Sequence, residues 1–342
     1  MSLRFMQLRL RCKRAYYLLR FTLLMLLTVF TIYACSSNTS QELPSNNKIA
    51  NSVSTSGATA RVIKHAMGET KVPAQPQRVV VLDTAPLDAA LALGVKPIGS
   101  SLPRTDSLPA YLGDRAAGIT PVGKTPPNLE AILRLQPDLI LGNTMAHRQI
   151  YDKLSQIAPT VLTAGNSTDG QWKQELQLFA QALDRVDAVQ PLLDDYDRRV
   201  AKLQQQLKAQ PSNIQVSVII TTEGWIAFYT QDSFPGSVLQ DVGLARPPAQ
   251  EVRGKSWEQV SREDINSIDG DAIFLLNVDS DTVPGSFTVN QFAKDPLFSQ
   301  LNAVQQGQVY QVDAEVWHLG SNILGANRIL DDLFKYLVAE KS

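Results

Sequence analysis

The sequence predicts an α/β protein of two lobes, each built on a central parallel sheet and joined by one long helix. Three observations lead to this prediction. Apolar strand-like runs alternate with helix-like segments, and this alternation is typical of parallel sheets. A unit of helix cap, helix and strand at 123–142 occurs a second time at 261–275. Between the two units, 187–208 has the apolar spacing of one amphipathic helix.

The first 34 residues have the pattern of a signal peptide. Basic residues without any acidic ones precede the run from Phe21 to Ala34, which is almost wholly apolar. A run of about fourteen residues is shorter than the roughly 20 that a membrane-spanning helix needs, so a transmembrane anchor is the weaker alternative. Ile32-Tyr-Ala-Cys35 resembles a bacterial lipobox, which predicts lipidation of Cys35. The following stretch to residue 60 is rich in Ser, Asn and Thr and resembles a flexible tether.

The charge of the mature chain excludes one class of function. The whole sequence has 32 Lys+Arg and 33 Asp+Glu, and removal of the six basic residues of the signal peptide leaves 26 − 33 = −7. An acidic protein is a poor general binder of nucleic acid. Cys12 and Cys35 are the two cysteines, so we expect no disulfide in the exported part.

The first lobe begins with a predicted hairpin at 61–73 and a strand at 77–82. A helix at 87–93 and a strand at 96–101 follow. Ligands of parallel sheets lie outside the carboxyl ends of the strands. We therefore expect one wall of a cleft to contain Asp83, Ser101 to Arg104, Lys124 and Asn143 to Arg148.

The repeated unit matches position by position. Asn128 and Ser261 are predicted helix caps, Glu130 and Glu263 stand two residues later, and Asp138 and Asp271 each precede a strand. A supersecondary unit that occurs twice at such long range indicates two similar lobes rather than a solenoid. In each unit the glutamate has an ordinary alternative role, which is to complement the helix dipole.

Two helices are predicted between the lobes, at 169–182 and 187–208. The second carries a stripe of Leu193, Tyr196, Val200, Leu203 and Leu207. Such a stripe is usually a packing seam, although a short coiled-coil dimer is an alternative. At roughly 1.5 Å per residue this helix would span about 30 Å, enough to join two lobes. The second lobe should contain a strand at 214–220, a hairpin at 225–229, a strand at 309–312 and a closing helix at 324–338.

Several motifs in a fixed order resemble a known family. They are the unit at 123–142, Ile157-Ala-Pro-Thr-Val161, the stretch Gly236 to Leu244, Trp257 to Ile265, Asp295-Pro-Leu-Phe298 and Val312-Asp-Ala-Glu-Val-Trp317. Together they resemble the substrate-binding lipoproteins of iron-siderophore and cobalamin ABC importers, most closely the ferric-dicitrate type. The resemblance implies two Rossmann-like lobes joined by the long helix, the helical-backbone periplasmic binding protein fold.

The resemblance also implies a function and partners. The protein would capture a ferric siderophore, ferric citrate or a similar chelate, between its lobes and deliver it to an ABC permease dimer of the inner membrane. A cobalamin- or haem-binding protein of the same fold is the alternative. The resemblance further implies a monomer in the periplasm or another extracytoplasmic space, held to the membrane by lipid on Cys35. Glu130 and Glu263 would dock onto the permease.

No enzyme is predicted. The three histidines are scattered, and the sequence has no nucleophile motif, phosphate loop or metal-spaced cluster. We therefore expect no cofactor and no direct metal site, with iron bound only as its chelate. Two other function classes are possible for this sequence. One is an interaction scaffold built on the stripe at 193–207, and the other is an enzyme or adhesin with this fold.

Five residues are candidate ligand contacts. Arg104, Arg148 and Arg253 follow predicted strand or loop ends, and a guanidinium binds carboxylates in a bidentate manner. The resemblance implies that Trp225 and Trp317 cover the ligand. The alternatives are solvated surface charges for the arginines and core packing for the tryptophans. The predicted organisation is a signal peptide at 1–34, a lipid-anchored linker at 35–60, an N-terminal lobe at 61–168, helices including the interlobe helix at 169–210, and a C-terminal lobe at 211–342.

Overall fold

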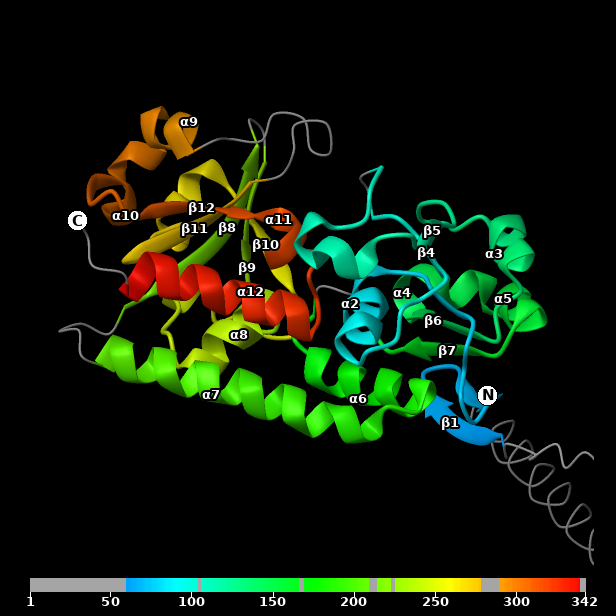
Figure 1. The fold of residues 1–342 in the computed structure, drawn as a ribbon. Helices are drawn as coiled ribbons and strands as arrows, with labels where there is room; N and C mark the ends of the chain where they lie inside the picture. Colours follow the sequence, from blue (N-terminus) through cyan, green and yellow to red (C-terminus); the bar gives the residue numbers. More distant parts are fainter. Residues whose placement is uncertain are drawn as a thin grey trace, which may run out of the picture. The chain divides into compact units, whose positions relative to one another are not determined.

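The computed structural model describes residues 60–103, 106–165, 169–208, 214–222, 225–277 and 289–338 (Figure 1). These residues all belong to one unit, Ser56–Ser342. The predicted signal peptide, tether and lipidation site at Cys35 lie outside the described residues, and so does Arg104. Within the described ranges, no helix is both long enough and apolar enough to cross a membrane.

The first sheet is wholly parallel, with strand order β5-β4-β3-β6-β7. Its central strands are short and buried on both faces, as their continuous apolar runs predict. A separate antiparallel hairpin of β1 (Arg61–His65) and β2 (Gly68–Val72) precedes it. The strands are β3 (Val79–Val81), β4 (Gly99–Ser100), β5 (Thr120–Pro121), β6 (Leu139–Asn143) and β7 (Thr160–Thr163). The helices of this first lobe are α2 (Thr84–Ala92), α3 (Leu129–Leu135), α4 (Thr144–His147), α5 (Tyr151–Ile157) and the 3₁₀ segments η1 (Ala110–Ala116) and η2 (Arg148–Ile150).

The second sheet is mixed, with strand order β10-β9-β8-β11-β12. β8, β11 and β12 pair in parallel, whereas β9 pairs antiparallel with both β8 and β10. The prediction of a hairpin within 225–229 is wrong, because these residues form the single strand β9. The strands are β8 (Val216–Thr222), β9 (Trp225–Tyr229), β10 (Trp257–Val260), β11 (Ala272–Asn277) and β12 (Val309–Asp313). The helices of this second lobe are α8 (Phe234–Val242), α9 (Val289–Lys294), α10 (Asn302–Gln305), α11 (Ala314–Trp317), α12 (Ile323–Leu333), the 3₁₀ segments η4 (Pro248–Gln250), η5 (Arg262–Ile268) and η6 (Phe298–Gln300), and a π-helical turn η7 (Phe334–Val338).

The predicted interlobe helix is α7 (Val189–Lys208), which follows α6 (Trp172–Leu183) and a 3₁₀ turn η3 (Val186–Ala188). Figure 1 shows α6 and α7 running alongside the two lobes. The predicted stripe is buried at Tyr196, Val200 and Leu203, while Leu193 and Leu207 pack partly buried against the same core. The stripe is therefore a packing seam within the chain, which removes the reason for a coiled-coil dimer.

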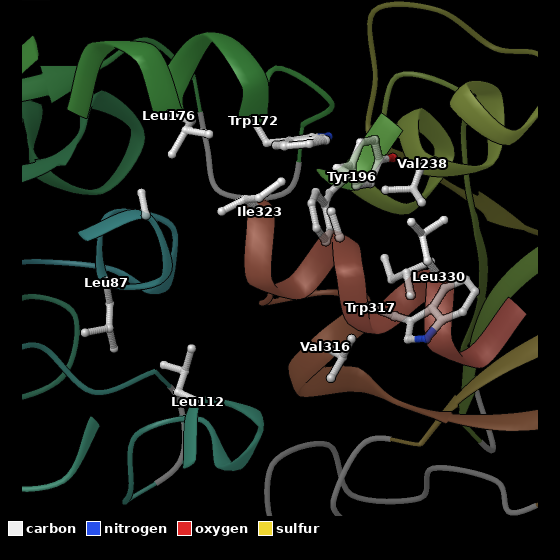
Figure 2. Packing of buried hydrophobic residues seen from close by; sticks show 14 of the residues in the cluster. Leu87, Leu112, Trp172, Leu176, Tyr196, Val238, Val316, Trp317, Ile323 and Leu330 are labelled. Carbon is white, nitrogen blue, oxygen red and sulfur yellow. The ribbon is translucent and has the colours of Figure 1, made fainter. Parts of the chain in front are cut away.

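One apolar core runs through both lobes. It contains side chains of α2 and the first sheet, of α6 and α7, and of the second sheet with α8 and α12. Figure 2 shows Leu87 and Leu112 on one side of this core and Trp317 and Leu330 on the other, with Trp172 and Ile323 between them. The fold class predicted from the sequence is confirmed, with the addition that the lobes share a core as well as a helix.

Candidate functional site

The carboxyl ends of the first-sheet strands bring polar side chains together, as the strand pattern predicted. Asp83 follows β3 and caps α2 by accepting a hydrogen bond from Thr84 N at 2.7 Å. Asn143 ends β6, caps α4 through Ala146 N at 2.9 Å, and donates from Nδ2 to Asp83 Oδ2. Lys124, after β5, pairs with Asp106 at 2.8 Å. The predicted wall at this edge thus contains a linked Asp83–Asn143 pair.

Two titratable side chains lie buried behind this edge. His147 is fully buried, and its Nε2 atom has no hydrogen-bond partner among the described residues, while burial lowers the pKa of its imidazole. Glu175 of α6 is also buried, and burial raises its pKa to about 8 although a hydrogen bond with Thr163 acts against this. Among the described residues, no group of three or more His, Cys, Asp or Glu is arranged to hold a metal ion.

A cavity of about 540 Å³ lies where the segment entering α6 faces the second lobe. This volume is within the range of ligand pockets in proteins. The two sides are held together by Gly170 N, which donates to Asp232 O at 2.8 Å, and by a β-bridge between Asp169 and Ser233. The lining is polar: Asp169, Gly170 and Gln171 on one side, and Gln231, Asp232, Ser237, Gln240, Gly254, Lys255 and Ser256 on the other.

The predicted contact Arg253 does not line this cavity, but it pairs with Asp232 and precedes Gly254, which both line it. Its guanidinium is 3.8 Å from Asp232 Oδ1, and Asp232 Oδ2 accepts a hydrogen bond from Gly254 N at 2.7 Å. Gly254 has a φ of +76°, a conformation that favours glycine. The Arg253 side chain is 73% exposed, so most of it remains available to a ligand. Asp232 therefore fixes the turn that carries Arg253 and Lys255.

The other predicted contacts do not line this cavity either. Arg148 is exposed in η2. Trp225, the first residue of β9, is half-buried and meets the Trp257 ring edge-on with a centroid distance of 5.8 Å. Trp257 is itself 47% exposed. Trp225 and Trp257 thus form a partly exposed aromatic pair on the two outer strands at one edge of the second sheet.

The structure corrects the predicted role of Trp317. The resemblance implied that it covers a ligand, but its side chain is fully buried. Its ring stacks on Phe274 at 4.8 Å, and Nε1 donates to Asp332 Oδ2 at 2.8 Å. The short helix α11 turns Trp317 back onto the face of the second sheet, so in this structure it belongs to the core. The next residue, His318, is half-buried and bonds Tyr229 Oη through Nδ1 at 3.0 Å.

Glu130 and Glu263 are both exposed in the first turn of a capped helix. Asn128 caps α3 through Ala131 N at 3.0 Å, and Ser261 caps η5 through Asp264 N at 3.3 Å. The two helices differ in one respect, because α3 is an α-helix and η5 is a 3₁₀ segment interrupted at Asp264. The capped starts predicted by the repeat are thus present in both lobes.

Sequence reasoning missed several residues of this region. Asp169, Asp232 and Lys255 were not singled out, because their proximity depends on how the lobes pack. Trp257 could have been found, since it opens one of the family-like motifs and is the first residue of β10.

Comparisons with known proteins place the chain in a family. The model of the family described as "Periplasmic binding protein" matches residues 79–316. The "Probable siderophore-binding lipoprotein YfiY" of Bacillus subtilis is 37% identical over 92% of this chain and 97% of its own length. The "Achromobactin-binding periplasmic protein" of Dickeya dadantii is 34% identical over 75% of this chain and 85% of its own.

Among solved structures, Staphylococcus aureus SirA complexed with staphyloferrin B superposes with a TM-score of 0.73 and 30% identity. The match covers 82% of this chain and 100% of that one. The sequence matches and this shared fold agree over most of the chain. The chain belongs to the periplasmic binding protein family.

Proposed function

We propose that this protein is the extracytoplasmic solute-binding component of an ABC importer, which captures a ferric siderophore such as ferric citrate between its lobes and delivers it to the membrane permease. The observation that carries the proposal is the cavity of about 540 Å³ with a polar, charged lining between the segment entering α6 and the second lobe. The proposal is supported by relatives named for siderophore or ferric citrate binding.

The cavity chemistry favours a chelate over a bare ion. A chelated ferric ion keeps its own oxygen ligands, so the protein has to recognise the polar shell around it. Lys255 in the lining and Arg253 beside Asp232 provide positive charge for carboxylate or hydroxamate oxygens, while Asp169 and Asp232 accept hydrogen bonds from donor groups. This mixed charge fits a polar chelate and does not single out citrate.

The remaining predicted contacts have supporting roles in the proposal. Arg148 and Arg104 would approach an anionic shell from the first lobe. Trp225, together with Trp257, would cover apolar parts of the ligand from the second. No resident cofactor is part of this function, and the protein would act as a monomeric carrier rather than an enzyme.

Delivery requires a surface that the permease recognises. We assign this role to Glu130 and Glu263, because each is exposed at the start of a capped helix in its own lobe. Two similar carboxylates on two similar lobes suit a dimeric permease with two basic pockets. Lipid on Cys35 would hold the carrier at the membrane.

Thermal unfolding of the purified protein with different ligands tests the proposal. We expect ferric citrate or a hydroxamate siderophore to raise the unfolding temperature, because a ligand at about 100 times its Kd stabilises by about 2.7 kcal/mol. The iron-free chelators are the controls. If haem or cobalamin alone stabilises the protein, that ligand replaces the siderophore in the assignment. If none of these compounds raises the unfolding temperature, the proposed function is contradicted.

A further inference from the structure

The amino-terminal end of α12 donates hydrogen bonds to a side chain of the other lobe. The first four N–H groups of an α-helix, counted from the N-cap residue, have no partner inside it. Ile323 N donates to Asn322 Oδ1 at 2.9 Å, and Ala326 N bonds back to Asn322 O. The amides between them, Leu324 N and Gly325 N, donate to Asp88 Oδ1 and Oδ2, each at 2.9 Å. A carboxylate 236 and 237 residues away in sequence thus completes the cap.

Asp88 lies on α2 of the first lobe and is 0% exposed. Its Oδ2 atom also accepts a hydrogen bond from the Tyr111 hydroxyl at 2.9 Å, and that hydroxyl lies 3.2 Å from Gly320 O. Tyr111 belongs to η1 of the first lobe, whereas Gly320 precedes α12. We call these contacts of Asp88 and Tyr111 with the chain at 320–325 the Asp88 latch.

The backbone at 320–325 is shaped to present the amides to Asp88. A Cβ at Gly325 would stand 2.6 Å from Gly320 O, and a Cβ at Gly320 would collide with Val316 O. Side chains at these two positions would therefore push the turn apart. One further bond crosses the lobes nearby, from Ala110 N to Glu315 Oε2 at 2.8 Å.

A buried carboxylate is costly unless its hydrogen bonds are satisfied. Asp88 is satisfied mainly across the junction of the lobes, because two of its three donors come from α12. A movement that separated α2 from α12 would remove two of the three donors of this carboxylate and leave two helix amides without their acceptor. Motions that keep the latch intact avoid that loss.

We propose that Asp88 is a positioning residue, which couples the first lobe to the start of α12 and so limits the range of angles between the lobes. The shared core resists separation in a general way, whereas the latch selects one arrangement of α2 against α12. This inference concerns the lobes themselves and does not depend on the identity of the ligand.

The test compares Asp88→Asn with Asp269→Asn in the full chain. Asp269 is a matched control, because its carboxylate also accepts bonds from two helix-start amides, Asn302 N at 2.9 Å and Ala303 N at 3.3 Å, but within the second lobe. Hydrogen exchange is measured at the α12 start. Spin-label distances are measured between cysteines placed at the exposed positions Arg134 and Asn266, with Cys12 and Cys35 replaced by Ser.

We expect Asp88→Asn to accelerate exchange at Leu324 and Gly325 by about tenfold to a hundredfold and to widen the distance distribution. Asp269→Asn should change neither, although it also loses a helix cap. Tyr111→Phe, a milder change, should accelerate the same two amides severalfold if Asp88→Asn does not fold. Wild-type distances and exchange in Asp88→Asn, or in Tyr111→Phe when only that variant folds, would overturn the proposal.

Discussion

Asp138 and Asp271 hold equivalent positions in the two sheets. Asp138 precedes β6 and accepts hydrogen bonds from Gln77 N and Arg78 N, at 2.8 and 2.9 Å, where the chain enters the neighbouring strand β3. Asp271 precedes β11 and accepts one from Gln215 N at 2.7 Å, where the chain enters β8. The repeat read in the sequence is therefore also a repeat of hydrogen bonding.

This equivalence motivates a prediction for Glu130 and Glu263. The double variant Glu130→Lys/Glu263→Lys should bind the ferric siderophore normally but lower uptake by about tenfold or more, because reversed charges slow and misalign docking. If the glutamates only complement helix dipoles, each reversal costs about 0.3–1 kcal/mol of stability and leaves uptake intact. Uptake and transporter-stimulated ATP hydrolysis distinguish the two roles. Asp152→Lys, an exposed reversal in the first turn of α5, is the control.

Arg253→Ala should weaken siderophore binding by about tenfold to a hundredfold, provided that its guanidinium meets the ligand shell. Stability should change little, because an exposed ion pair such as Arg253–Asp232 contributes about 0–1 kcal/mol. Quenching of Trp fluorescence during titration measures the affinity. Arg148→Ala and Arg104→Ala extend the test to the first lobe, and Arg134→Ala is an exposed control. Unchanged affinity in all three test variants would exclude arginine recognition of an anionic shell.

The sequence predicted what depends on neighbours along the chain. Asn128 and Ser261 were recognisable as caps, and the stripe at Tyr196 and Val200 predicted the buried face of α7. Contacts between distant segments left no such signal. Asp88 looks like a lone charge in an apolar helix until α12 packs against it, and the cavity exists only where Asp169 approaches the second lobe.

Trp317 shows a second limit of sequence reasoning. A tryptophan after a strand end can turn towards a cleft or back onto the sheet. The spacing of residues in the sequence does not distinguish these two orientations. Trp317→Ala should cost about 3–5 kcal/mol of unfolding free energy, as for a large core side chain. Trp317→Phe keeps a ring to stack on Phe274 and should leave siderophore affinity unchanged. If a folded Trp317→Phe variant bound the siderophore clearly more weakly, Trp317 would be a ligand contact after all.

Cys35→Ser should release the protein from the membrane fraction. The motif Ile32 to Cys35 predicts a single lipid anchor, and no described helix is able to span a membrane. Cell fractionation in a strain without the permease is the measurement, because docking could otherwise retain the protein. Full retention of the variant in that strain would reveal a second anchor.

Stability should depend on pH through Asp88 and Glu175. Burial raises the pKa of Asp88 to about 7 and that of Glu175 to about 8, from ordinary values of 3.8 and 4.5. Between the ordinary and the raised pKa, the folded protein holds protons that the unfolded chain releases. These groups therefore make the protein more stable as pH falls from about 8 to about 5. At about 1.4 kcal/mol per pKa unit, these differences set an upper limit of roughly 5 kcal/mol for each group.

Urea unfolding from pH 5 to pH 8 measures this effect as a difference between variants. The lowered pKa values of His65 and His147 act in the opposite direction, because the unfolded chain takes up protons there first as pH falls. Comparison with Glu175→Gln cancels their contribution.

We expect Glu175→Gln to flatten the profile of stability against pH and to gain stability relative to the parent at pH 8, because its amide carries no charge into the buried site. Asp88→Asn should flatten the profile as well, but it should lose stability at pH 8 since its amide cannot accept both α12 bonds. Parallel profiles for the parent and Glu175→Gln would show that Glu175 titrates near its ordinary value, with its carboxylate reached by solvent.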